Sequence, residues 1–290
     1  MNNDKNFNEM IDFIENSNKI NKVKKKKTSK FVLLIINLLS ITLLISGGIG
    51  LKIIYDKKLD YKKTEEMEQE LADIYNRNSN VEPNQNGNND LVEAPEEVPK
   101  EEYTESFNEL LSINSDTVGW LKVNNTNINM PIVKSSNNNY YLTKNFKKEY
   151  SVLGWLFADY RNEFNNGLSK NTIIYGHTMK NGPGLMMSSL KNVLDNSWLN
   201  NSDNLQITFD TPNKNMKWQV FSIYTTPVTD DYLRVNFDSD ADFINFTNML
   251  KNRSIRNFGV TINGDDNIIT LSTCYLNADN RLVVHAKLIK

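Results

Sequence analysis

The pattern of hydrophobic and polar positions separates the first sixty residues from the rest of the chain. Residues 31–51 form an uncharged run of 21 residues, most of them leucine, isoleucine, valine or glycine. At about 1.5 Å per residue, a helix of this length crosses a hydrocarbon layer of about 30 Å. The run is longer than a signal-peptide core and no Ala-x-Ala site follows it, so a retained anchor is favoured over a cleaved signal. We therefore predict a transmembrane signal anchor at residues 31–54.

Beyond residue 100, apolar and polar positions alternate in short runs that are typical of β-strands. Eight such runs occupy residues 119–123, 128–133, 153–157, 172–175, 205–209, 218–224, 268–273 and 282–289. Helical periodicity is confined to residues 105–113, 185–194 and 241–251, the last behind Ser239 or Asp240 as a cap. This pattern predicts a mainly β fold, an eight-stranded barrel or sandwich with a few peripheral helices.

The segment between the apolar run and the strands is polar. Residues 64–75 are compatible with a short helix, whereas residues 76–100 are rich in asparagine, glutamate and proline and contain few apolar anchors. We therefore expect an extracellular stalk at residues 55–100 and one folded domain at residues 101–290. A cytoplasmic basic tail is expected at residues 1–30.

Lysines on either side of the apolar run predict its orientation. Residues 19–30 hold seven lysines and no acidic residue, while the lysines of the other flank are diluted by Asp56 and Asp60. The positive-inside rule then keeps the amino terminus in the cytoplasm. This predicts a single-pass type II protein of the cell membrane, in contact with lipid through residues 31–54 and with the domain at residues 101–290 outside the cell.

Composition narrows the possible partners. A hydrophobic fraction of 39% and a net charge of −2 give no electrostatic attraction to nucleic acid, so no nucleic-acid partner is expected. The glycines are scattered and form no phosphate-binding loop. The two histidines and the one cysteine lie far apart in sequence, so we expect neither a metal nor a cofactor.

Cys274 is the one cysteine of the chain, and it ends the apolar run that starts at Ile268. A single thiol forms no internal disulfide, and on its own it is equally consistent with a small buried side chain. A nucleophilic thiol requires a nearby base or cation and donors for the developing oxyanion. The sequence must therefore supply such partners.

His177 and Arg281 are the candidate partners. His177 follows the predicted strand at 172–175 and opens a loop, whereas His285 lies inside the last strand, about 13 Å along it from Arg281. His177 is therefore favoured as the base. A hairpin after Cys274 would return Arg281 beside the thiol, although spacing alone fits a surface arginine equally well.

These residues carry a resemblance to the sortases, specifically class B. Thr-Leu-Ser-Thr-Cys at 270–274, Tyr-Gly-His-Thr-Met at 175–179 and Arg281 with the strand behind it are the most specific segments. Residues 118–121, 130–133, 139–142 and 154–161 are also similar to that family. The resemblance covers about residues 105–290.

The resemblance implies an eight-stranded sortase-type β-barrel with cysteine transpeptidase activity. Cys274 would attack the threonine carbonyl of a sorting signal near the carboxyl end of a secreted protein and form a thioester acyl-enzyme. His177 would protonate the leaving amine and Arg281 would bind the carbonyl oxygen. A peptidoglycan amine of the cell wall would then attack the thioester, and the secreted protein would become covalently attached to it. By analogy, the peptide cleft would be lined by Leu142, Tyr175, Ser272, Tyr232 and Leu233.

Two departures and several alternatives accompany this interpretation. Residues 137–139 are all asparagine, where many relatives have an acidic residue, and the connection from Cys274 to Arg281 is short. A cysteine peptidase of the papain type would place its cysteine before its histidine. A cell-wall L,D-transpeptidase would carry its arginine almost directly after the cysteine. A non-enzymatic surface binding module remains open on the residues alone.

Overall fold

The computed structural model describes residues 12, 15, 29–79, 105–165, 167–179, 184–275 and 277–289. Contacts between residues divide the chain into two units, residues 1–55 and residues 56–290. Most of the expected basic tail at 1–30 lies outside the described residues, as do residues 80–100 of the expected spacer.

The described part of the first unit is the beginning of helix α2 (Lys30–Ser79). This helix contains a stretch long and apolar enough to cross a membrane, judged by length and composition. The large apolar side chains of this stretch are exposed, with Leu43 and Leu44 at 74% and 75%. Such a surface is stable in hydrocarbon rather than in water.

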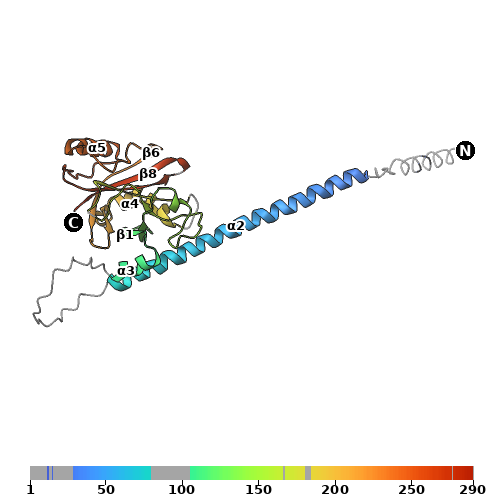
Figure 1. The fold of residues 1–290 in the computed structure, drawn as a ribbon. Helices are drawn as coiled ribbons and strands as arrows, with labels where there is room; N and C mark the ends of the chain where they lie inside the picture. Colours follow the sequence, from blue (N-terminus) through green and yellow to red (C-terminus); the bar gives the residue numbers. More distant parts are fainter. Residues whose placement is uncertain are drawn as a thin grey trace, which may run out of the picture. The chain divides into compact units, whose positions relative to one another are not determined.

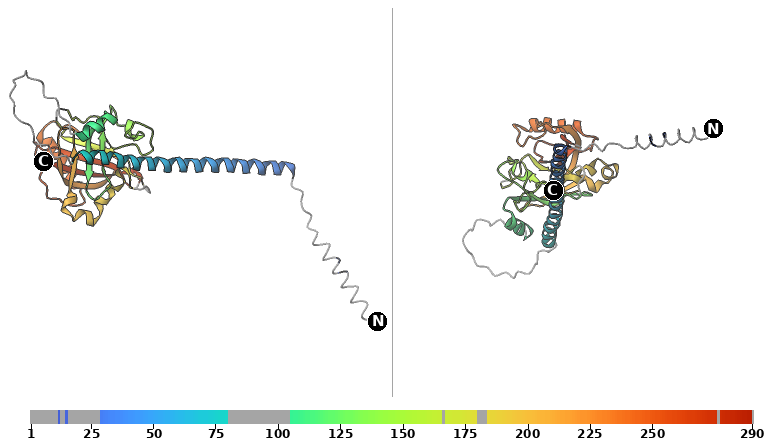
Figure 2. Two further views of the ribbon diagram at one scale, coloured as in Figure 1. Left: turned by 90° about the horizontal axis from the view of Figure 1, so that it is seen from below. Right: turned by 90° about the vertical axis from the view of Figure 1, so that its right-hand side faces the viewer.

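The second unit contains a closed barrel, which confirms the predicted fold class (Figure 1). Within the described residues the strand order is β1-β2-β3-β4-β7-β8-β6-β5. Their bounds are β1 (Thr117–Val123), β2 (Asn129–Val133), β3 (Phe157–Ala158), β4 (Asn171–Gly176), β5 (Gln206–Asp210), β6 (Lys217–Pro227), β7 (Ile268–Tyr275) and β8 (Asn277–Leu288). Figure 2 shows the same barrel from two further sides. Closure removes the exposed sheet edges that would otherwise pair with another chain.

Strand β3 is shorter than the predicted strand at 153–157, because only Phe157 of that run joins the sheet. Gly154 has a φ of +59° and packs against the carbonyl oxygen of Tyr141. Trp155 donates its backbone N–H to that oxygen and its indole N–H to the Pro131 carbonyl. The run is thus apolar because it is buried in the core, and its backbone is held by a loop rather than by a strand partner.

The helices of this unit cover the barrel. They are α3 (Glu105–Ile113), α4 (Asn196–Leu199), α5 (Asp240–Arg253) and the 3₁₀ segments η1 (Tyr140–Leu142), η2 (Met186–Leu194) and η3 (Ser202–Leu205). Ser239 caps α5 by accepting a hydrogen bond from the Asp242 N–H, as one of the two predicted caps. Phe243 and Leu250 of α5 pack with Val283 of β8 in a second cluster, called the outer cluster. Figure 1 shows α5 beside the strands β6 and β8.

The end of α2 belongs to the barrel unit. Met67, Leu71 and Ile74 are buried in the same core as the barrel residues, and Tyr75 stacks on Trp120 with ring centroids 4.1 Å apart. The unit that holds the barrel starts at Asp56, and the expected catalytic-domain boundary at residue 101 stays a prediction. Residues 56–79 of the expected stalk form a helix whose apolar stripe is covered by the barrel.

Glu68 makes this docking sensitive to pH. Its carboxylate accepts a hydrogen bond from the Met186 N–H at 3.0 Å, and burial raises its pKa from 4.5 to about 7. The folded chain then holds this proton more tightly than the unfolded chain does. The free energy of unfolding should therefore fall, by up to about 3 kcal/mol, as the pH rises from about 4.5 to about 7.

The test compares Glu68→Gln with the wild type. We expect the Tm of the full chain in detergent micelles, followed by tryptophan fluorescence between pH 5 and 8, to fall less steeply in this variant. Glu70→Gln is the matched control, since Glu70 lies two residues further along and forms an exposed pair with Lys147. Parallel pH curves for Glu68→Gln and the wild type would contradict the prediction.

Candidate active site

Strand register brings the three candidate catalytic residues together. In the antiparallel pair of β7 and β8, Cys274 lies directly opposite Arg281, at a spacing of about 5 Å. In the parallel pair of β4 and β7, Gly176 is level with Thr273. The next residues along the two segments are His177 and Cys274, so these two residues are neighbours where the pair ends. Because side chains alternate along a strand, Cys274 and Ser272 share one face and Thr273 points to the other.

Thr273 fixes the chain next to the histidine. The Thr273 hydroxyl donates to the Gly176 carbonyl at 2.7 Å. The Thr178 hydroxyl oxygen lies 2.5 Å from the Thr273 hydroxyl oxygen. The His177 carbonyl accepts from the Met187 N–H at 3.1 Å. The two residues that flank His177, and its own backbone, are therefore anchored before any substrate binds.

All eight predicted site residues line one cavity of about 700 Å³, which we call the groove. The groove is lined by Asn138, Leu142, Phe157, Tyr175, Gly176, His177, Val228, Thr229, Asp230, Tyr232, Leu233, Ser272, Thr273, Cys274 and Arg281. Side chains from β4, β7, β8, the segment that contains η1 and the loop after β6 therefore meet there. Cys274 is partly exposed, so its thiol can be reached from the groove.

The imidazole of His177 has a defined orientation. Its Nε2 lies 3.0 Å from the carbonyl oxygen of Leu142. A carbonyl oxygen only accepts, so this contact requires the hydrogen on Nε2 and leaves Nδ1 for proton exchange. Leu142 therefore orients His177 through its backbone carbonyl, in addition to lining the groove.

The remaining predicted groove residues differ in their exposure. Tyr232 is buried, and its hydroxyl lies 3.0 Å from that of Ser272; burial raises the pKa of this tyrosine. Leu233 and Tyr175 are half-buried at the groove wall. Burial and the neighbouring Asp159 carboxylate raise the pKa of Tyr175, which stays a neutral donor at physiological pH.

His285 lies in the outer cluster and not in the groove lining. Its Nε2 is 3.0 Å from the Tyr224 hydroxyl and its Nδ1 is 2.9 Å from the Thr270 hydroxyl. Complete burial lowers its pKa to about 3. This imidazole is therefore neutral and ties β6, β7 and β8 together.

Asn138, Asp159 and Arg161 were not among the predicted site residues. Asn138 lines the groove, and Asp159 binds Asn138 and Tyr175 from behind. Their signal in the sequence was weak, since Asp159 and Arg161 lie in a segment noted only as similar to the sortases and Asn138 lies in the asparagine run noted as a departure from them. The useful signal was the pair of Asp159 and Arg161 directly after the apolar run at residues 153–158, because a buried carboxylate needs a charged or hydrogen-bonding partner.

The comparisons with known proteins agree with this geometry. The family model for the sortase domain matches residues 121–289. The chain belongs to the sortase family. Sortase B of Staphylococcus aureus is 37% identical over 194 residues, covering 66% of this chain and 78% of that protein. Sortase B of Listeria monocytogenes is 36% identical, covering 65% of this chain and 76% of that protein.

Solved structures place this sortase in class B. Sortase B from B. anthracis, in complex with AAEK1, has a TM-score of 0.66 at 34% identity and covers 80% of this chain and 99% of its own. The Staphylococcus aureus sortase B–substrate complex has a TM-score of 0.63 at 30% identity. The match covers 81% of this chain and 97% of that chain. Members of this family are cysteine transpeptidases, and this chain is therefore a sortase-type cysteine transpeptidase.

Proposed function

We propose that this sortase cleaves a sorting signal near the carboxyl end of secreted proteins and transfers them to a peptidoglycan amine of the cell wall. The observation that carries the proposal is the cross-strand pair of Cys274 and Arg281, with His177 in the same groove. One structure of a sortase B is complexed with triglycine, a ligand that fits an amine acceptor. A groove of about 700 Å³ also suits a short peptide.

In the first half of the reaction, the thiol proton of Cys274 passes to His177, and Sγ attacks the threonine carbonyl carbon of the sorting signal as a thiolate. A carbon–sulfur bond forms, the peptide C–N bond breaks, and His177 gives a proton to the leaving amine. The guanidinium of Arg281 donates to the carbonyl oxygen as negative charge develops on it, without losing a proton of its own. The product is a thioester on Cys274.

In the second half, an amine attacks the thioester carbon. His177 takes the proton of the amine, the new amide forms, and the sulfur of Cys274 leaves. Water is the competing nucleophile. The groove residues Leu142, Tyr175, Ser272, Tyr232 and Leu233 would hold the peptide while the amine enters.

We propose further that the chain is held in the cell membrane by residues 31–54, with residues 1–30 inside and the catalytic domain outside. Support comes from the exposed apolar surface of α2 and from the lysines before it. The lipid bilayer, secreted proteins with a sorting signal and the cell-wall amine would be its partners.

The test is transfer to an added amine. The full chain in detergent micelles is incubated with a library of hexapeptides that each contain one threonine, with and without triglycine. We expect cleavage after threonine and a new product in which triglycine is joined to the threonine carbonyl, identified by mass spectrometry. Cleavage without any amine product would make the protein a hydrolase and contradict the transfer step.

A further inference from the structure

Asp159 lies just after β3 and is fully buried, although it is an acidic residue at the edge of the substrate groove. A second cavity of about 600 Å³ adjoins the groove and is lined in part by Asp159 and Arg161. The two cavities share Asn138, Tyr175, Asp230 and Leu233, so the carboxylate lies behind a common wall. A buried carboxylate is retained only where donors satisfy it.

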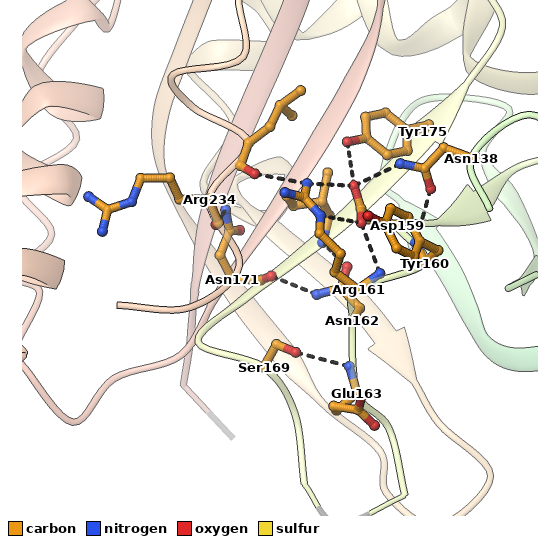
Figure 3. A network of polar contacts seen from close by, with 12 residues as sticks. Asn138, Asp159, Tyr160, Arg161, Asn162, Glu163, Ser169, Asn171, Tyr175 and Arg234 are labelled. Carbon is orange, nitrogen blue, oxygen red and sulfur yellow. Dashed lines mark hydrogen bonds and ion pairs between the residues drawn. The ribbon is translucent and has the colours of Figure 1, made fainter. Parts of the chain in front are cut away.

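Five hydrogen bonds converge on this carboxylate (Figure 3). Oδ1 accepts from the backbone N–H of Arg161 at 3.0 Å and from its Nε at 2.8 Å. Oδ2 accepts from the other arm of the Arg161 guanidinium at 2.8 Å, from the Tyr175 hydroxyl at 2.8 Å and from the Asn138 amide at 3.0 Å. Burial acts to raise the pKa of Asp159, but these donors outweigh it and hold the pKa below its ordinary value.

The network reaches three parts of the groove wall. Tyr175 comes from β4, and Asn138 precedes η1. The third part is the loop after β6, because the Arg161 guanidinium also donates to the Leu233 carbonyl at 3.0 Å. The Asn138 amide is held at its other end by the Tyr160 N–H, which donates to its oxygen at 2.9 Å (Figure 3). A single carboxylate therefore ties together segments that are distant in sequence.

We propose that Asp159 is a positioning residue of the sortase reaction, which holds Tyr175, Asn138 and, through Arg161, Leu233 in the geometry that binds the peptide. The inference rests on the proposed function. Asp159 does not line the groove with Cys274, so it acts through these residues and not on the reacting atoms. Loss of the carboxylate should loosen the groove wall and weaken substrate binding more than chemistry.

Asp159→Asn is the sharpest variant, because it keeps the shape and removes one acceptor. Both carboxylate oxygens receive donors, so the amide nitrogen of asparagine meets a donor whichever way it is turned. Asp210→Asn is the matched control. Asp210 is also a buried carboxylate that accepts a tyrosine hydroxyl, from Tyr75 at 2.7 Å, and it lines neither cavity.

The experiment measures KM and kcat for a hexapeptide that the wild type selects from the one-threonine library, using the full chain in micelles. The rate of alkylation of Cys274 by iodoacetamide and the Tm are measured alongside. We expect Asp159→Asn to raise KM by at least about tenfold while kcat and the alkylation rate change by less than about threefold. Asp210→Asn should lower Tm and leave KM within about twofold of the wild-type value.

Arg161→Lys keeps the positive charge and tests the same network if Asp159→Asn does not fold. A lysine has no planar fork, so it cannot bind Asp159 with two nitrogens and reach the Leu233 carbonyl as well. We expect a smaller rise in KM, of about threefold to tenfold. A KM within about twofold of wild type in the folded variants, or an equal rise in Asp210→Asn, would overturn the inference. A wild type that cleaves no library peptide would overturn the proposed function, and this inference with it.

Discussion

Replacement of Cys274 by alanine should lower kcat/KM for the peptide by about 10⁴-fold or more, because no other thiol exists in the chain. The side chain is only partly buried, so its removal leaves no large cavity and Tm should stay close to that of the wild type. Steady-state cleavage of the library-selected peptide measures the first effect. Thermal unfolding measures the second.

Cys274→Ser is the conservative companion of this variant. It preserves the size and polarity of the side chain but replaces the thiol by a hydroxyl, which is far harder to deprotonate than the thiol. We expect it to fold and to retain less than about a hundredth of wild-type kcat/KM. Substantial turnover in the alanine variant would mean that the nucleophile is another residue.

Replacement of Arg281 by lysine should lower kcat by about 10²- to 10³-fold, with a smaller change in KM. Arg281 lies opposite Cys274, and its guanidinium donates to the Asn280 carbonyl. Its planar guanidinium presents several N–H donors in a fixed geometry that suits an oxyanion, whereas a lysine ammonium acts as a point charge. The loss is therefore expected in the transition state and not in ground-state binding.

Arg256→Lys is the control for this substitution. Arg256 lies 4.7 Å from the ring centroid of Phe258 and does not line the groove. Its replacement should leave kcat within about twofold of wild type. A kcat for Arg281→Lys within about threefold of wild type would show that Arg281 does not stabilise the oxyanion.

The strands were predictable because alternation is a local property. Val284 and Ala286 point into the core from β8 while Val283 packs in the outer cluster, as period-two patterning requires. The short β3 was not predictable from its apolar run. Burial makes residues 153–156 apolar, and the turn at Gly154 that removes them from the sheet leaves no periodic signature.

The docked end of α2 and the network behind the groove were harder to anticipate. Met67, Leu71 and Ile74 fit the short helix expected at residues 64–75, but no local pattern shows that its apolar stripe packs on the barrel. Asp159 is hydrogen-bonded to Asn138, 21 residues away in sequence, and Arg161 is hydrogen-bonded to Leu233, 72 residues away. Such contacts depend on tertiary folding and not on local pattern. The eight predicted residues share one groove, and their individual roles remain predictions.

Acylation of Cys274 is the most direct test of this account. The full chain is mixed with the selected peptide without added amine, quenched with acid and measured by intact-mass spectrometry, and the modified residue is located after proteolysis. We expect a mass increase equal to the peptide fragment that ends at threonine, located on Cys274, absent from Cys274→Ala and discharged by triglycine. Peptide cleavage with an unmodified Cys274, or with the adduct on another residue, would contradict the account.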